Sequence, residues 1–320
     1  MTRFAFRGAM VALSYIASLD LVLWMLGWVN QFCCRRMFKT ATLFYFADSR
    51  YLQASTFAWY ARTRRWRPCL VGGYSLGDVA GFTCVVGASE QDILDGANHH
   101  RLIALHARMN RVAQLLRLAS VSYSGILPSV LARAGVKRVP IEVDRTVHWV
   151  VQAVRQILAQ GDLPPDTVVI VLGACGHVGA RLCDVLRSEM PNSVVEIDPL
   201  HCDANKRDAQ QSFECMAAMN CRALVLNVSR SQVLEKYVEI LCPGCVVLNE
   251  VYPEVETHTL VRLAQRGVRY VHLQGVHGLT WPSFPGAYCG AVPLCAASAA
   301  SESLGSRAMQ ASREVLLRDG

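Results

Sequence analysis

The chain has 320 residues, of which 52% are hydrophobic and 18% charged, and its net charge is +7. At roughly 100 to 200 residues per domain, this length predicts two domains, and so apolar a composition excludes disorder for most of the chain. The 22 glycines and 12 prolines exclude collagen-like and low-complexity classes. The mild basic surplus lacks the dense patches of nucleic-acid binders, so we expect no nucleic-acid partner. The 13 cysteines are odd in number and scattered, which favours a reducing compartment, the cytoplasm, over a disulfide framework.

An apolar run at residues 9–31 is long enough to span a bilayer, with one acid, Asp20, near its middle. It leaves three alternatives open: a membrane span, a helix in the membrane interface and a buried helix. The run is followed by three basic residues that would keep the next part of the chain on the cytoplasmic side, Arg35, Arg36 and Lys39. We therefore predict residues 1–45 as an apolar segment associated with the cytoplasmic face of a membrane, with the membrane surface as a partner.

Residues 46–145 are predicted to form a smaller α/β domain that holds the substrate. Its pattern indicates glycine-punctuated strands over 70–87, a helix from Asp92 to about Ser120, and strand and loop over 121–143. An amphipathic helix over 146–160 and a Gly-Pro-rich linker at 161–166 come next. They introduce a nucleotide-binding domain that we place at 146–285.

A glycine motif follows this linker in the setting that nucleotide-binding turns require. The buried-strand pattern of 167–172 leads directly into Gly173, Gly176 and Gly179, and a helical pattern follows. Here a pyrophosphate can approach bare amides at a helix start, where the dipole favours an anion. Gly173 would make the tight turn, Gly176 would admit the phosphates and Gly179 would let strand and helix pack closely. We predict that the cofactor is bound by the whole turn: Gly173, Ala174, Cys175, Gly176, His177, Val178 and Gly179.

The next strand pattern, 193–198, ends in Asp198, 19 residues after Gly179. A carboxylate at this place bonds a ribose hydroxyl and repels a 2′-phosphate, which favours NADH over NADPH. Two basic residues slightly further on, Lys206 and Arg207, would reverse that preference, so both cofactors stay open.

Strand and helix then alternate from residue 167 to residue 273, which predicts a doubly wound parallel sheet, the Rossmann fold. Ligands bind beyond the carboxyl ends of strands in such sheets. Candidate cleft residues on this basis are Ser229, Tyr252, Gln274 and His277. We predict Ser229 as a further cofactor contact and His277 or Tyr252 as the proton donor. The pair Cys242 and Cys245 has redox or zinc-site spacing but no accompanying ligand pair, and its Pro-Gly centre favours a turn.

A cysteine near the carboxyl terminus is the candidate nucleophile, within a final segment, 286–320. Cys295 follows Pro293 at a predicted helix start, where the dipole lowers a thiol pKa and backbone amides would stabilise an oxyanion. A thiolate beside a nicotinamide takes an acyl group and holds it for hydride delivery. The alternatives are an inert buried cysteine at this position and Cys289 as the nucleophile.

The order of elements resembles that of the long-chain acyl-(acyl-carrier protein) reductases, which form fatty aldehydes, and more loosely the shikimate dehydrogenase and glutamyl-tRNA reductase group. The likeness rests on Val171-Leu-Gly-Ala-Cys-Gly-His-Val-Gly179, Leu248-Asn-Glu-Val-Tyr-Pro253 and Cys295-Ala-Ala-Ser298. The resemblance implies phosphates on the three glycines and an acyl-enzyme on Cys295. Glu250 and Val251 replace the family's glycines before Tyr252, and Ser298 replaces its glutamate.

The resemblance therefore implies an NAD(P)H-dependent reductase that converts an acyl thioester, carried by acyl carrier protein or coenzyme A, to an aldehyde. Two alternatives remain open: an NAD(P)-dependent dehydrogenase of a small hydroxy or amino acid, and a dinucleotide-binding protein without catalysis.

Overall fold

The computed structural model describes residues 3–34, 36–46, 56–76, 79–138, 141–164, 166–190, 193–198, 222–284 and 291–297, and the backbone of strand β12, Val315–Asp319. The chain divides into two compact units, one of residues 1–145 and 275–314 and one of residues 146–274 and 315–320. Residues 1–45, which we predicted as a separate segment, fall in the first unit together with 46–145. Most of the predicted final segment, 286–320, falls in that unit as well.

The second unit is built on a parallel sheet. Its strands are β5 (Val168–Leu172), β6 (Val194–Ile197), β7 (Ala223–Asn227), β8 (Val246–Asn249) and β9 (Arg269–His277), in the order β6-β5-β7-β8-β9. The chain passes from β5 to β6 on one side of β5, and then returns to place β7 on its other side. The direction in which strands are added to the sheet therefore reverses at β5. The carboxyl end of β5 is therefore a topological switch point, where α/β sheets place their ligands.

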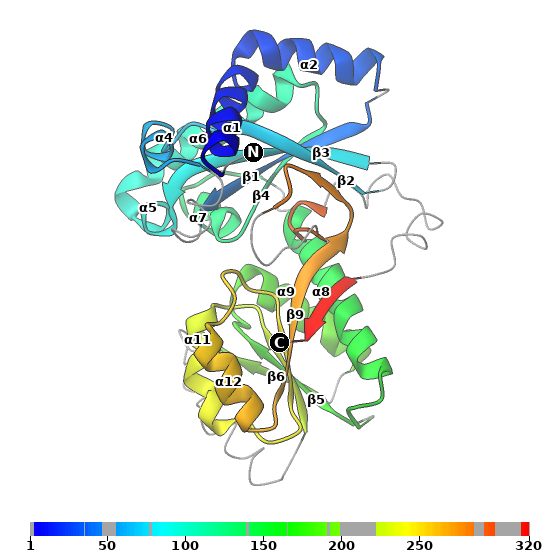
Figure 1. Cartoon of the computed structure of the whole chain (residues 1–320). Helices are drawn as coiled ribbons and strands as arrows, with labels where there is room; N and C mark the ends of the chain where they lie inside the picture. The colour runs from blue at the N-terminus through cyan, green and yellow to red at the C-terminus, as the bar shows by residue number, and fades with distance from the viewer. Residues whose placement is uncertain are drawn as a thin grey trace. The chain divides into compact units, whose positions relative to one another are not determined.

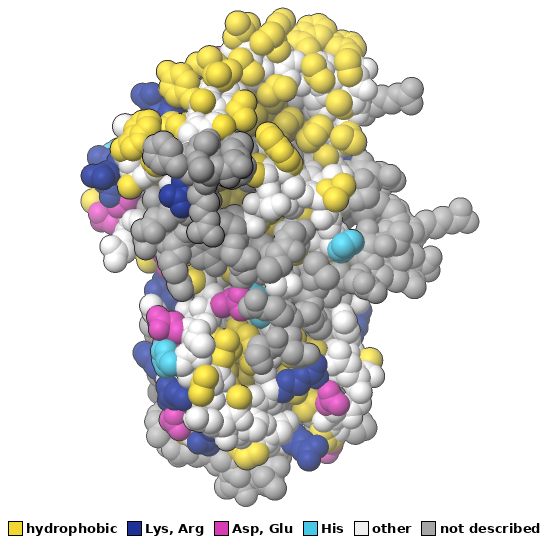
Figure 2. Space-filling view, in the orientation of Figure 1, with side chains coloured by type: hydrophobic (Ala, Val, Ile, Leu, Met, Phe, Trp, Pro, Cys, Tyr) yellow, Lys and Arg dark blue, Asp and Glu magenta, His cyan; other side chains and the backbone are white. Residues whose placement is uncertain are grey.

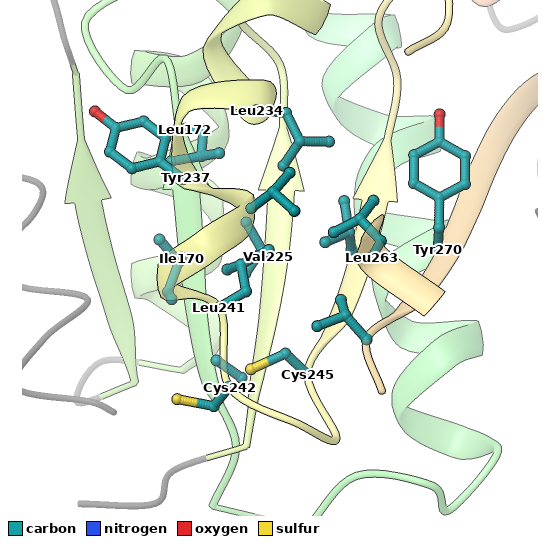
Figure 3. Packing of buried hydrophobic residues seen from close by; sticks show 14 of the residues in the cluster. Ile170, Leu172, Val225, Leu234, Tyr237, Leu241, Cys242, Cys245, Leu263 and Tyr270 are labelled. Carbon is teal, nitrogen blue, oxygen red and sulfur yellow. The ribbon is translucent and has the colours of Figure 1, made fainter. Parts of the chain in front are cut away.

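Helices cover both faces of this sheet (Figure 1), as the predicted Rossmann-like α/β fold requires. They are α8 (Ile141–Ala159), α9 (His177–Glu189), α11 (Ser231–Tyr237) and α12 (Thr257–Gln265). Leu234 and Tyr237 of α11 and Leu263 of α12 belong to one buried cluster with strand residues such as Ile170 and Val225 (Figure 3). Strand residues alternate between the two faces, and both faces are buried, which explains the continuous apolar runs in the sequence.

Cys242 and Cys245 belong to this core. Neither forms a disulfide, and both are buried, at 8% and 3% exposure, where the chain turns between the 3-10 helix at Val238–Ile240 and β8. Gly244 adopts φ +82° and the amide of Cys245 donates to the carbonyl of Cys242 at 3.2 Å. The prediction of a turn is confirmed, and no group of three His, Cys, Asp or Glu side chains in the described residues could hold a metal ion.

The first unit contains a mixed sheet of order β10-β2-β3-β1-β4. Its strands are β1 (Phe38–Phe46), β2 (Cys69–Leu76), β3 (Val79–Ser89), β4 (Ser120–Tyr123) and β10 (Leu279–Trp281); its helices include α4 (Ala58–Thr63), α5 (Glu90–Leu94), α6 (His99–Leu115) and α7 (Leu127–Arg133). Strand β1 runs parallel to both β3 and β4. This strand was not predicted, because residues 1–45 were assigned to the apolar segment. Helix α7, which begins beside Pro128 in a region predicted as strand and loop, was not predicted either.

The prediction of one helix over 9–31 is wrong. Two helices form instead, α1 (Arg3–Ala17) and α2 (Asp20–Phe32), and Leu19 between them is extended, with ψ 135°. The Ser18 hydroxyl donates to the carbonyl of Ser14 and ends α1, while Asp20 supplies a favourable negative charge to the first turn of α2. No single helix among the described residues is both long and apolar enough to cross a bilayer. Arg7–Ala17 and Asp20–Phe32 meet that test only as a pair, bent by 81°.

Candidate dinucleotide site

The glycine turn lies between β5 and α9, as predicted. Gly173 adopts φ +95°, a conformation that favours glycine, and its carbonyl accepts the amide of Gly176 at 3.0 Å. The helix begins at His177, and the first amide to make an intrahelical bond is that of Ala180, to the carbonyl of Gly176 at 2.8 Å. The preceding amides, 177–179, therefore point towards the helix N-terminus, which is where an anionic group is bound.

Two of the three glycines are required by close packing. A Cβ on Gly179 would lie 2.0 Å from the carbonyl oxygen of Gly173, and a Cβ on Gly173 would lie 2.8 Å from the Cβ of Ser229. A Cβ on Gly176 would meet only the Gly173 carbonyl, at 3.3 Å, and Gly176 is exposed between two exposed neighbours, Cys175 and His177. Backbone packing thus accounts for Gly173 and Gly179. At Gly176 a side chain would instead occupy the space above the helix start.

The acid predicted to contact the ribose lies beside this turn. Asp198 follows β6, and its carboxylate accepts the amide of Cys175 at 2.9 Å. The two neighbouring amides, of Gly173 and Ala174, donate to the carbonyl of Ile197. The end of β6 therefore holds the turn. Lys206 and Arg207, on which the NADPH alternative depends, lie outside the described residues.

Ser229 joins the turn to a group of buried polar side chains. Its amide donates to Oδ1 of Asn227 at 3.3 Å, while its side chain packs against Gly173. Asn227 is the last residue of β7 and is fully buried. The predicted cleft residue Ser229 is thus fixed on one side by the turn and on the other by Asn227.

Three buried polar residues then lie side by side at the carboxyl end of the sheet. The register pairs Asn227 of β7 with Asn249 of β8, and Asn249 with His272 of β9. Nδ2 of Asn227 donates to Oδ1 of Asn249 at 2.7 Å, and Nδ2 of Asn249 lies 3.1 Å from Nδ1 of His272. All three have 0% exposure. We call Asn227, Asn249 and His272 the polar ladder.

The polar ladder was not predicted from the sequence. The available signal was an asparagine at the end of two successive apolar strands, Ala223–Asn227 and Val246–Asn249. An amide buried at such a place requires partners, because an unsatisfied buried polar group costs about 1 to 3 kcal/mol. A histidine within the third strand supplies one.

Tyr252 packs against the end of this ladder. Its ring lies edge-on to His272, with centroids 4.7 Å apart, and its hydroxyl donates to the carbonyl of Gln274 at 3.0 Å. Oε1 of Glu254 lies 3.9 Å from Nε2 of His272. Tyr252 thus contacts the histidine and the strand end, and in this conformation its hydroxyl proton is directed to the Gln274 carbonyl. Its part as a proton donor stays a prediction.

Burial raises the pKa of Glu250, which follows Asn249, to about 8, although the residue as a whole is only half-buried. Its amide donates to the carbonyl of Asn227 at 3.1 Å. Glu250 stands where the resembled family has a glycine. The raised pKa favours the protonated form of this carboxyl group near neutral pH.

Two of the predicted catalytic residues, Cys295 and His277, belong to the first unit. Cys295 is half-buried in a turn after strand β11 (Ala291–Val292), and the amides of Ala296 and Ala297 both donate to the carbonyl of Pro293 at 2.9 Å. These two amides therefore do not serve as oxyanion donors in this conformation. His277 is exposed at the end of β9. The alternative nucleophile Cys289, and Ser298, lie outside the described residues.

An apolar groove of about 560 Å³ also lies in the first unit. It is lined by residues of α1, α2, β1, β2, β3 and β10, almost all of them apolar. Tyr74 is among them, and its hydroxyl bonds that of Thr42 at 3.1 Å, which in turn bonds Ser122 at 2.8 Å. Burial raises the pKa of Tyr74, and Cys295 is near enough to the phenol to raise it further. The groove has the volume of a small-molecule site.

No protein-family model matches the chain, and no curated protein matches it in sequence. Among solved structures, the chain is similar to L-tryptophan dehydrogenase from Nostoc punctiforme, with 14% identity and a TM-score of 0.33 over 73% of this chain and 68% of that one. It is also similar to D-2-hydroxyisocaproate dehydrogenase, with 12% identity and a TM-score of 0.28 over 72% of this chain and 76% of that one. The resemblance to the acyl reductase family stays a prediction.

Proposed function

We propose that the chain is an NAD(P)-dependent oxidoreductase whose second unit binds the dinucleotide at the turn of residues 173–179. The observation that carries this proposal is the difference among the glycines. Packing requires two of them, whereas the third, Gly176, leaves open the place where a pyrophosphate lies in the Rossmann fold. The bound cofactor would supply hydride transfer.

The chain's own residues have separate parts in this proposal. The amides of 177–179 would bind the pyrophosphate, and Asp198, already at the turn, would bind the ribose hydroxyls. The polar ladder lies at the carboxyl end of the same sheet, where the substrate and the nicotinamide meet in this fold. Because its three residues are fully buried, the ladder would fix the strand ends beside which the substrate binds. This polar edge of the sheet favours a hydroxy or amino acid as the substrate class.

Gly176→Ala tests the cofactor site. An added methyl group should leave the unfolding free energy within about 1 kcal/mol of wild type, since its nearest contact is at 3.3 Å, yet lower NADH affinity at least about tenfold. Isothermal titration with NADH and NADPH measures that affinity. Gly96→Ala is the matched control, because a Cβ there meets only the His99 ring, at 3.9 Å. Unchanged NADH binding by Gly176→Ala would contradict the site.

The acyl thioester reductase is the second candidate, and the apolar groove favours it. The groove and Cys295 both belong to the first unit. Tyr74 lines the groove, and its phenol lies near Cys295. Here Cys295 would attack the thioester carbonyl, release the carrier thiol and keep the acyl group. Incubation with a long-chain acyl thioester without cofactor, followed by intact-mass measurement, tests this step. An acyl adduct that Cys295→Ala abolishes supports this candidate, and the absence of an adduct leaves the hydroxy or amino acid dehydrogenase.

A further inference from the structure

The solvent-exposed surface of α1 and α2 is largely apolar. Ten large hydrophobic residues between Leu13 and Phe32 are each between 39% and 67% exposed. Figure 2 shows hydrophobic side chains gathered over these two helices. Contiguous apolar surface of this kind marks an interaction site. We call this set of exposed side chains the apolar cap.

Both helices of the cap are fastened to the unit beneath by their inner faces. The buried side chain of Asn30 in α2 bonds the backbone amide and carbonyl of Phe38 at 3.1 and 2.9 Å. Gly27 lets α2 approach the backbone of α6, since a Cβ there would lie 2.0 Å from the Leu115 carbonyl oxygen.

Helix α1 is held in the same way. The hydroxyl of Ser14 bonds that of Tyr60 at 3.0 Å, and the hydroxyl of Ser18 accepts the amide of Leu70 at 2.9 Å. The helices therefore lie along the unit and present their outer faces together.

The composition of the cap is that of a protein surface at a membrane interface. Trp24, Trp28 and Phe32 form a row of rings along α2, with centroids 5.7 and 4.7 Å apart. Amphipathic aromatic side chains of this type favour the headgroup level of a bilayer. Arg117 lies over the Trp28 ring at 4.2 Å, so a cation accompanies the aromatic row.

The charge around the cap is complementary to an anionic surface. Residues 1–117 carry 14 Lys and Arg against 6 Asp and Glu, a surplus of eight, so the rest of the chain has a net charge of −1. Arg64 lies over the ring of Tyr15 at 4.8 Å, a second cation at the edge of the cap. The acid within the cap, Asp20, is neutralised by Arg111 of α6 at 2.7 Å. A second copy of this basic unit would be repelled, whereas anionic lipid headgroups would be attracted.

We infer that the apolar cap docks on an anionic lipid surface. The outer faces of α1 and α2 enter the boundary between headgroups and acyl chains, and the surrounding arginines pair with lipid phosphates. This inference is independent of the proposed oxidoreductase function. It concerns the location of the chain and leaves its chemistry untouched.

Vesicle flotation of the full chain tests the inference. Vesicles of phosphatidylglycerol and phosphatidylcholine in equal parts should bind the protein at least about tenfold more tightly than phosphatidylcholine alone, because an anionic surface attracts the arginines around the cap. Leu21→Glu, at the most exposed position of the cap, should lower that binding at least about tenfold. Val261→Glu, at an exposed apolar position of α12, is the matched control and should bind like wild type.

Brominated lipids locate the contact. They should quench tryptophan fluorescence in wild type, and the double variant Trp24→Phe, Trp28→Phe should lose most of that quenching while still floating with the vesicles. Thermal unfolding of each variant shows that the fold is kept. Equal binding to neutral vesicles, binding that survives Leu21→Glu, or no binding would each overturn the inference. A dimer in solution that Leu21→Glu dissociates, without vesicle binding, would assign the cap to a second copy of the chain instead.

Discussion

Of the 17 large hydrophobic residues that the described part of the chain exposes, 16 belong to the first unit and one, Val261, to the second. The second unit instead places buried polar groups, the polar ladder, at the carboxyl end of its sheet beside the glycine turn. Both units are α/β, so fold class does not separate them. The comparison teaches that the second unit offers the turn that we propose for the cofactor, and that the first offers apolar surface and an apolar groove.

The largest effect should come from Gly179→Ala in the second unit. Its Cβ would lie 2.0 Å from a backbone oxygen, so strand and helix must separate, at a cost of about 3 kcal/mol or more. Hydrogen exchange measured by mass spectrometry should show lost protection in β5 and α9, with protection in β1 and β3 retained. Equal loss of protection in both units would show that the substitution destabilises the first unit as much as the second.

Buried asparagines allow a direct comparison of the units. Asn249→Ala and Asn30→Ala each remove a nearly inaccessible amide with several hydrogen bonds, and each should cost about 2 to 4 kcal/mol in urea unfolding. Asn249→Ala should also weaken NADH binding, because Asn249 bonds Asn227, which holds Ser229 against the turn. Equal NADH affinity in the two variants would separate the polar ladder from the cofactor site.

Glu250 predicts how the stability of the second unit depends on pH. Its pKa is raised by burial to about 8 in the folded state, above the ordinary 4.5, so the folded form holds a proton that the unfolded form releases. Its contribution to stability is complete below about pH 4.5 and is lost as the pH rises towards 8, on the order of a few kcal/mol.

Glu250→Gln should flatten that decline in unfolding free energies measured from pH 5 to pH 8. Glu239→Gln is the control, because Glu239 lies on the surface, where its pKa is lowered by hydrogen bonding to Arg262. An unchanged slope in Glu250→Gln would show that the carboxyl group is ionised throughout this range.

The smallest effect is expected from surface ion pairs, one in each unit. Asp20→Asn breaks the pair between Asp20 and Arg111, whose respective side chains are 61% and 64% exposed. Glu189→Gln breaks the pair between Glu189 and Arg155. Each should change the unfolding free energy by less than about 1 kcal/mol. Asp20→Asn should slightly tighten binding to anionic vesicles, since it adds one net positive charge at the cap, and Glu189→Gln should not.

The sequence predicted the second unit well because its signals are local. The run Val168–Leu172 followed by three glycines at fixed spacing indicates strand, turn and helix within about 20 residues, and Asp198 follows from the next strand. The first unit was predicted less well. Strand β1 has the same apolar composition as the run before it, and only its pairing with β3 and β4 distinguishes the two.

The sequence by itself determined the Rossmann-like alternation and the places of Gly173, Gly179 and Asp198, because these depend on backbone conformation and on neighbours close in the chain. Only the tertiary structure brought Asn227, Asn249 and His272 together, since the register of three strands sets those contacts over 45 residues of chain. Only the tertiary structure, likewise, decided that the apolar run breaks at Ser18 and Leu19 and leaves one face exposed. Composition shows how apolar a helix is, whereas packing against β2 and α6 decides which of its faces is buried.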